Sequence, residues 1–255
     1  MSSPSHRLIL RSASLVVLLL LPIAAGCGPP QVELEETYAG LEGDAVFDHS
    51  AFDRLLATHV DTAGLVDYAA LAEDSSALDR YVASLAEAPF DDMGRDERLA
   101  LLINAYNAFT LRLILDYYPV DSIRSIPASE RWEAERWELP TGTFSLNQIE
   151  HELIRPNFRE PRIHFALVCA AIGCPILRQE AYTGAALEEQ LEEQTRFTHS
   201  RERWVRYERG AEVIHLTRLY DWYGGDFEQV AGSVLAYVAR YRDDLAADLA
   251  AGHEP

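Results

Sequence analysis

The stretch Arg95–Tyr117, RDERLALLINAYNAFTLRLILDY, decides the fold. Its apolar residues recur three and four positions apart, which places them on one face of a helix, and Pro119 predicts where that helix ends. Asn104 and Asn107 lie one turn apart beside the apolar face. Because buried amides need hydrogen-bond partners, the two residues are candidates either for core scaffolding or for a site.

Further helices and two hairpins are predicted around this stretch. Apolar periodicity indicates helices near Phe52–Val60, Leu78–Leu85 and Leu187–Phe197, and a final helix from about Asp226 to Leu249. Pairs of short apolar segments flank turn sequences over residues 137–146 and 204–216, which is typical of hairpins.

Two shorter patterns complete the expected fold. Ser145 with Gln148 forms a capping-box pattern that predicts a helix through Ile154, and the run Ile163–Cys169 indicates a short buried strand. Helices and strands therefore mix without regular alternation. We expect an α+β fold, with a helical N-terminal half packed on a small mixed or antiparallel sheet.

Length and charge limit the classes of function. The chain has 255 residues, and residues 44–252 suffice for a single globular domain. The formal net charge is -19, and all 22 basic residues are arginine. A polyanion would be repelled by such a surface, so nucleic acid binding is disfavoured.

The N-terminus has the pattern of an export signal. Arg7 and Arg11 precede an apolar run from Leu15 to Ile23, which is too short to span a membrane, and small residues lead to Cys27. We expect residues 1–26 to be removed and Cys27 to be lipidated. The membrane would then be a partner through this lipid.

The segment after the signal indicates a tether. Residues 27–43 are acidic, contain proline and lack apolar periodicity, which suits a spacer that lifts the domain off the membrane. The predicted location is the bacterial cell envelope, on the periplasmic face of the outer membrane or on the cell surface.

Two further cysteines mark the candidate site. Cys169 and Cys174 lie in the segment Arg162–Pro175, and a disulfide between them fits an oxidising compartment. Alternatively, one sulfur is a nucleophile, because a cysteine held near backbone N–H groups favours the thiolate. A zinc site would need two more ligands at short spacing, and thiol redox chemistry usually has the tighter C-x2-C pattern. No metal or cofactor is expected.

A nucleophilic cysteine would need a base. On a strand, His164 and Cys169 would point to opposite faces, which leaves His151 and His215 as bases brought in from elsewhere. Glu150 could orient an imidazole, although neighbours on a helix such as Glu150 and His151 diverge by about 100°.

Several short motifs together resemble a known family. They include Asp48–Phe52, Ile103–Ala108, Ile149–His151, Arg162–Pro175 and Trp222–Phe227, and they span nearly the whole mature chain. The chain resembles the family called domain of unknown function 547. The family pattern often has Asn before the first cysteine and Ser two places after it, whereas this chain has Val168 and Ala171.

The resemblance implies a set of site residues and two hypotheses. Its polar motif positions fall on Asn104, Asn107, Glu150, His151, His164, Cys169 and Cys174, and by analogy the fold would lie near papain-like or transglutaminase-like cysteine enzymes. The first hypothesis is a thiol-dependent hydrolase or acyltransferase that acts on an amide or ester, with Cys169 as nucleophile and His151 as base. The second is a non-catalytic binding or scaffold lipoprotein with a Cys169–Cys174 disulfide. In either case the ligand is an unidentified small molecule or peptide.

Overall fold

The computed structural model describes residues 29–171 and 173–255, so the predicted signal segment and Cys27 lie outside it. The helices are α1 (Ser50–His59), α2 (Tyr68–Glu73), α3 (Ser76–Ser84), α4 (Arg95–Asp116), α5 (Ala128–Arg131), α6 (Leu146–Gln148), α7 (Leu187–His199), α8 (Leu219–Ala231), α9 (Val234–Ala239) and α10 (Asp243–Ala250). The strands are β1 (Trp137–Leu139), β2 (Gly142–Phe144), β3 (Val205–Glu208) and β4 (Val213–Leu216).

The α+β class is confirmed. Each pair of strands forms a small antiparallel hairpin, with Trp137 opposite Phe144 in one and Val205 opposite Leu216 in the other. The two hairpins belong to separate two-stranded sheets, so the described helices pack mainly on one another.

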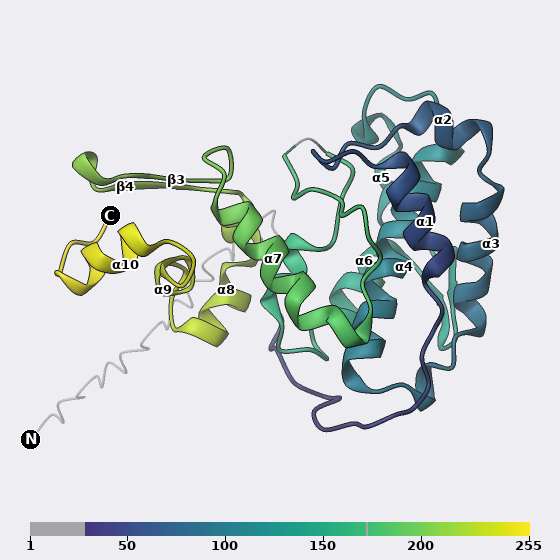
Figure 1. Ribbon diagram of the computed structural model, residues 1–255, viewed down its shortest axis with the longest axis horizontal. Coiled ribbons are helices and arrows are strands. Elements are labelled where there is room, and N and C mark those ends of the chain that lie inside the picture. Colours follow the sequence, from purple (N-terminus) through teal and green to yellow (C-terminus); the bar gives the residue numbers. More distant parts are fainter. Residues whose placement is uncertain (1–28, 172) are drawn as a thin grey trace, which may run out of the picture.

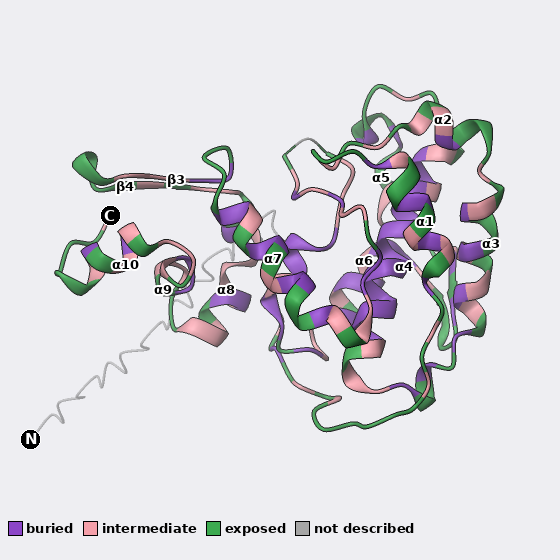
Figure 2. Cartoon of the chain, viewed as in Figure 1, coloured by how far each residue is buried: buried purple, intermediate pink, exposed green. Residues whose placement is uncertain are grey.

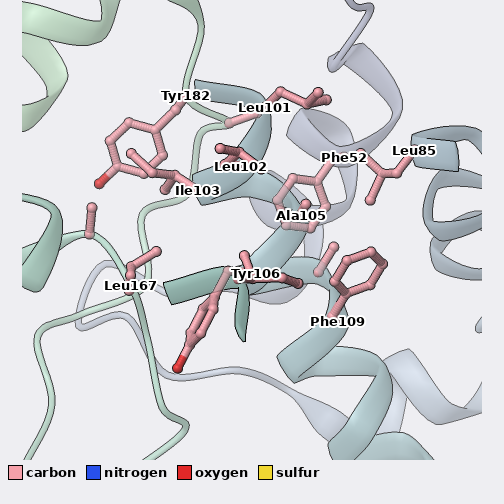
Figure 3. Packing of buried hydrophobic residues seen from close by; sticks show 14 of the residues in the cluster. Phe52, Leu85, Leu101, Leu102, Ile103, Ala105, Tyr106, Phe109, Leu167 and Tyr182 are labelled. Atoms are coloured by element: carbon pink, nitrogen blue, oxygen red, sulfur yellow. The ribbon is translucent and has the colours of Figure 1, made fainter. Parts of the chain in front are cut away.

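Helix α4 forms the centre of the larger lobe. It is long and apolar enough to cross a membrane, but 83% of its apolar window is buried inside the protein, which makes it a core helix. Figure 3 shows Leu102, Ala105 and Phe109 of α4 packed near Phe52 of α1, within the main apolar cluster. Figure 2 shows that α4 is mostly buried, whereas the outer helices of this lobe carry more exposed residues.

A smaller lobe is formed by the part of the chain that follows α7. Helices α8–α10 and the β3–β4 hairpin share a second apolar cluster, which includes Phe165, Trp204, Phe227 and Tyr237. In Figure 1 this lobe lies beside the α1–α4 lobe, with α7 between the two. A cavity between lobes is a common place for a binding site.

Two sequence-based predictions about secondary structure are wrong. The predicted helix Asp226–Leu249 is divided into three, because Gly232 adopts a left-handed conformation (φ 84°) that ends α8 and the Ser233 side chain caps α9. The predicted strand Ile163–Cys169 is instead a 3-10 turn, Pro161–Phe165, followed by a loop. Its apolar residues are buried between the lobes without a partner strand, and an apolar run alone does not distinguish these two situations.

Candidate functional site

A group of buried polar side chains lies around a cavity of about 410 Å³ between the two lobes. It receives side chains from α4, from the turn after α6, from the 3-10 turn Pro161–Phe165 and from α8. The cavity is lined by Pro29, Pro30, Tyr106, Trp132, Asn147, Glu150, His151, His164, Leu167, Cys169, Cys174, Leu219, Trp222 and Tyr223. Such a volume suits a small ligand or one end of a larger one.

A π-helical turn positions Glu150 and His151. Ser145 and Gln148 form the predicted capping box, in which the Ser145 Oγ accepts from the Gln148 N–H and the Gln148 side chain accepts from the Ser145 N–H. The chain then widens into the π-helix Ile149–Ile154, closed by the Arg155 N–H donating to the Glu150 carbonyl at 3.0 Å. Both Glu150 and His151 line the cavity, although neighbours on an α-helix were expected to diverge. Single π-turns inside helices are frequent at functional sites.

A buried charged array holds two histidines of the cavity wall. Arg155, which is 0% exposed, donates to both carboxylate oxygens of Asp226 at 2.8 and 2.9 Å. The Nε2 of His164 lies 2.8 Å from Asp226 Oδ2. Burial raises the pKa of Asp226, but hydrogen bonds from His164 and Arg155 outweigh it and leave the pKa below the usual value. Asp226 is therefore an ionised acceptor, as buried paired carboxylates usually are.

The hydrogen bonds assign a proton to each imidazole. Because ionised Asp226 accepts, the His164 Nε2 carries the hydrogen, and in the neutral ring its Nδ1 is a lone-pair acceptor. This Nδ1 lies 3.9 Å from Glu150 Oε1. The His151 Nδ1 lies 3.0 Å from Arg155 Nη1 and must accept, since a guanidinium only donates, so its Nε2 carries the hydrogen. Burial lowers the pKa of His151, and Arg155 adds to this while Glu150 opposes it.

Two tyrosines complete the polar wall. The ring of Tyr223 stacks on His164 with a centroid distance of 3.8 Å, and the Arg155 guanidinium lies 5.0 Å from the centre of the same ring. Burial raises the pKa of Tyr106 and of Tyr223, and the nearby Glu150 carboxylate raises both further. Both phenols are therefore neutral hydrogen-bond donors.

The two cysteines form a disulfide at the edge of the cavity. Cys169 and Cys174 are joined, and both line the cavity together with His164. In this state neither sulfur is a nucleophile, which agrees with the second hypothesis and requires reduction for the first. The predicted opposition of His164 and Cys169 across a strand is wrong, because no strand forms there. A second cavity of about 390 Å³ shares Cys174 and is lined mainly by apolar side chains of segments 63–68, 168–171 and 174–177.

Asn104 and Asn107 hold backbone instead of facing this cavity. The Asn104 amide donates to the Tyr182 carbonyl at 2.7 Å and accepts from the Tyr182 N–H at 2.9 Å. Asn107 donates to the Ala166 carbonyl at 3.0 Å and accepts from the Val168 N–H at 2.9 Å. These hydrogen bonds favour the core-scaffolding alternative for both residues, and Asn107 positions the loop that leads to Cys169.

The remaining candidates are placed as follows. His215 lies on β4, half exposed and 3.2 Å from Glu208, away from the cavity, so it is excluded as a base. Among residues 29–171 and 173–255, no group of three or more His, Cys, Asp or Glu side chains is placed to hold a metal ion.

Four residues of the site were not predicted from the sequence. Tyr106, Tyr223 and Asp226 all occur in the motifs that carried the family resemblance, so that resemblance was the available signal. No sequence signal pointed to Arg155, since its role depends on the contact between the π-helical turn and α8.

The comparisons with known proteins place the site partly within a family domain. Residues 90–197 match the family described as "Protein of unknown function, DUF547". The matched region contains Tyr106, Glu150, His151, His164 and both cysteines. The matched region is shorter than the span of the motifs that suggested the resemblance, which run from Asp48 to Phe227. Asp226 lies outside the matched region. No curated protein and no solved structure matches the chain. The analogy to papain-like and transglutaminase-like folds stays a prediction.

Proposed function

We propose that the protein is a lipid-anchored hydrolase or acyltransferase of the bacterial cell envelope, acting on an amide or ester in the cavity between its lobes. Cys169 is the nucleophile, His164 is the base and Asp226 orients His164. The observation that carries the proposal is the His164 imidazole, fixed by ionised Asp226 and lining the same cavity as both sulfurs. A base held by a third group is the usual way to activate a thiol.

The hydrogen bonds favour His164 over His151 as the base. In a neutral His164 ring, Nε2 donates to Asp226 and Nδ1 is available to take a proton, whereas the Nδ1 of His151 accepts from Arg155 and its Nε2–H can only donate. His151 is therefore better suited to donate to the negative oxygen that develops on a carbonyl substrate. Glu150, 3.9 Å from the His164 Nδ1, would stabilise the imidazolium once that nitrogen is protonated.

The proposed reaction begins with reduction. A dithiol reductant converts the Cys169–Cys174 disulfide into two thiols and is itself oxidised to a disulfide. His164 then takes the Cys169 proton, and the thiolate attacks the carbonyl carbon of the substrate. The C–N or C–O bond breaks as the imidazolium returns the proton to the leaving group. Water hydrolyses the resulting thioester, or a second nucleophile accepts the acyl group, and the thiol is restored.

Matched cysteine variants test this proposal. Cys174→Ser leaves the Cys169 thiol unpaired, so it should hydrolyse a soluble aryl ester without reductant, whereas the wild-type protein should require dithiothreitol. Cys169→Ser should be inactive under both conditions, and His164→Gln in the Cys174→Ser background should reduce kcat/KM by about 10²–10⁴-fold. Equal activity of Cys169→Ser and Cys174→Ser would refute the assignment of the nucleophile.

A second candidate function is a non-catalytic binding lipoprotein. The disulfide favours it, because it engages both sulfurs and would fix one wall of the cavity. In that case reduction should weaken folding or ligand binding and generate no ester hydrolysis in any variant. The same set of variants therefore distinguishes the two functions.

The export and lipid anchor of this proposal are supported by the N-terminal sequence alone. Mass spectrometry of protein extracted from membranes should find a diacylglyceryl-modified Cys27 as the first residue. An unmodified or uncleaved N-terminus would refute the anchor.

A further inference from the structure

The segment that follows the predicted lipidation cysteine packs against the domain and is not a free spacer. The Gln229 side chain of α8 accepts from the Leu34 N–H at 2.8 Å and donates to the Val32 carbonyl at 2.9 Å. Leu34 is 4% exposed, and Glu36 pairs with Arg95 of α4 at 3.0 Å. The segment is therefore attached to both lobes.

The start of this segment is also a wall of the candidate site. Pro29 and Pro30 line the cavity with Glu150 and His164. The Pro30 carbonyl accepts from Arg155 Nη1 at 3.0 Å, and the same guanidinium holds Asp226. The position of the N-terminal segment is thus fixed by the central cation of the site.

Chain length then limits how far the site can lie from the predicted anchor. Cys27 precedes Pro29 by two residues, and an extended chain spans at most about 3.6 Å per residue, so the two Cα atoms lie within roughly 7 Å of each other. A lipid on Cys27 would hold this edge of the cavity at the bilayer surface. Electrostatic attraction would not help. Loss of residues 1–26 removes two arginines and no acid, so the net charge falls from -19 to about -21 and repels anionic lipid headgroups.

We infer that the cavity faces the membrane and that its substrate is an amphiphile within the bilayer, such as an ester or amide that carries an acyl chain. This inference rests on the proposed function for the chemistry and on the docked segment for the orientation. Trp132 and Trp222 line the same cavity, and tryptophan is well suited to the boundary between headgroups and acyl chains.

The orientation can be tested without any catalysis. Protein extracted from membranes and labelled with 5-fluorotryptophan is placed in phosphatidylethanolamine–phosphatidylglycerol nanodiscs that contain a gadolinium-chelating lipid. The 19F signals of Trp132 and Trp222 should broaden more than that of a reporter at Ala83→Trp, an exposed position on α3. A Gly/Ser linker of about 20 residues inserted after Gly28, with a reach of roughly 25 Å, should abolish the difference.

Equal broadening at all positions, or stronger broadening at the α3 reporter, would overturn the inferred orientation. So would an N-terminus without lipid. Gln229→Ala, which removes both hydrogen bonds to the segment, should reduce the difference in broadening without unfolding the domain. A Gln229→Ala protein that is folded but broadened like the wild type would show that the docked segment does not set the orientation.

A second measurement tests the substrate class. The wild-type protein and the linker variant, both reduced, are compared on a long-chain fluorogenic ester in the same lipids and on a short-chain soluble ester. The linker variant should be at least tenfold slower on the membrane-borne ester and unchanged on the soluble one. Equal rates on the membrane-borne ester would overturn the inference, whereas no hydrolysis of either ester would reject the proposed function and leave the orientation result standing.

Discussion

Replacing Asp226 by Asn should cost the protein much of its stability. The Asp226 side chain is 1% exposed and accepts from Arg155 twice and from His164 once. The amide has nearly the same shape but no charge and only one acceptor oxygen, so the fully buried Arg155 guanidinium would lose its counterion. It would keep one side-chain oxygen at position 226, the Pro30 carbonyl and the His151 ring as acceptors. Breaking a buried ion pair from one side costs about 3–5 kcal/mol, out of a total of about 5–15 kcal/mol.

Urea unfolding followed by tryptophan fluorescence measures this loss. With an m-value of roughly 2 kcal/mol/M, the midpoint for Asp226→Asn should fall by about 2 M. Asp221→Asn on the same helix is the matched control, since Asp221 is 72% exposed and lies 3.5 Å from Arg218. Exposed pairs of this kind contribute less than about 1 kcal/mol. If Asp226→Asn lost no more stability than Asp221→Asn, the buried array would not hold the two lobes together.

Two further predictions concern stability. Burial lowers the pKa of His49 and of His199 to about 4, so the unfolded chain binds protons from about pH 6.5 downward while the folded protein does not until about pH 4. The free energy of unfolding should therefore decrease between about pH 7.5 and pH 5, by on the order of 2 kcal/mol for each histidine. Urea titrations at both pH values measure this decrease. His49→Gln should make the decrease smaller. Asn107→Ala should lower the Tm by roughly 5–10 °C in calorimetry, because it leaves the Ala166 carbonyl and Val168 N–H without partners; a shift below about 1 °C would contradict the role of Asn107 as a backbone clamp.

Local signals predicted most of the elements. The helix expected over Arg95–Tyr117 is α4, Arg95–Asp116, and the Ser145–Gln148 capping box forms as expected. Both hairpins also occur close to their predicted positions. These features depend on periodicity, caps and turns within a few residues of one another, which a single sequence records.

Features that depend on contacts between distant segments could not be predicted in this way. The strand expected at Ile163–Cys169 fails because the run is buried by α4 and α8, and the Asn107 clamp replaces a strand partner. Glu150 and His151 share a cavity only because a π-helical turn follows α6, and no residue pattern in the sequence predicted this turn. Arg155 and Asp226 are 71 residues apart in the chain, so their pairing appears only once the two lobes are packed.

The candidate site was predicted in part. Glu150, His151, His164 and both cysteines do line one cavity, whereas Asn104 and Asn107 have structural roles. The proposed base is His164 and not the predicted His151, because tautomers follow from hydrogen-bond partners that a sequence does not specify.

The most direct test of the central claim is the reactivity of Cys169 in the Cys174→Ser variant. Alkylation by iodoacetamide, followed by intact-protein mass spectrometry over a range of pH, gives the pKa of the thiol. If His164 activates Cys169, this pKa should lie clearly below the ordinary value of about 8.5, and His164→Gln should return it to that value. A Cys169 thiol that titrates at or above about 8.5 in both variants would contradict a thiol-dependent site in this cavity.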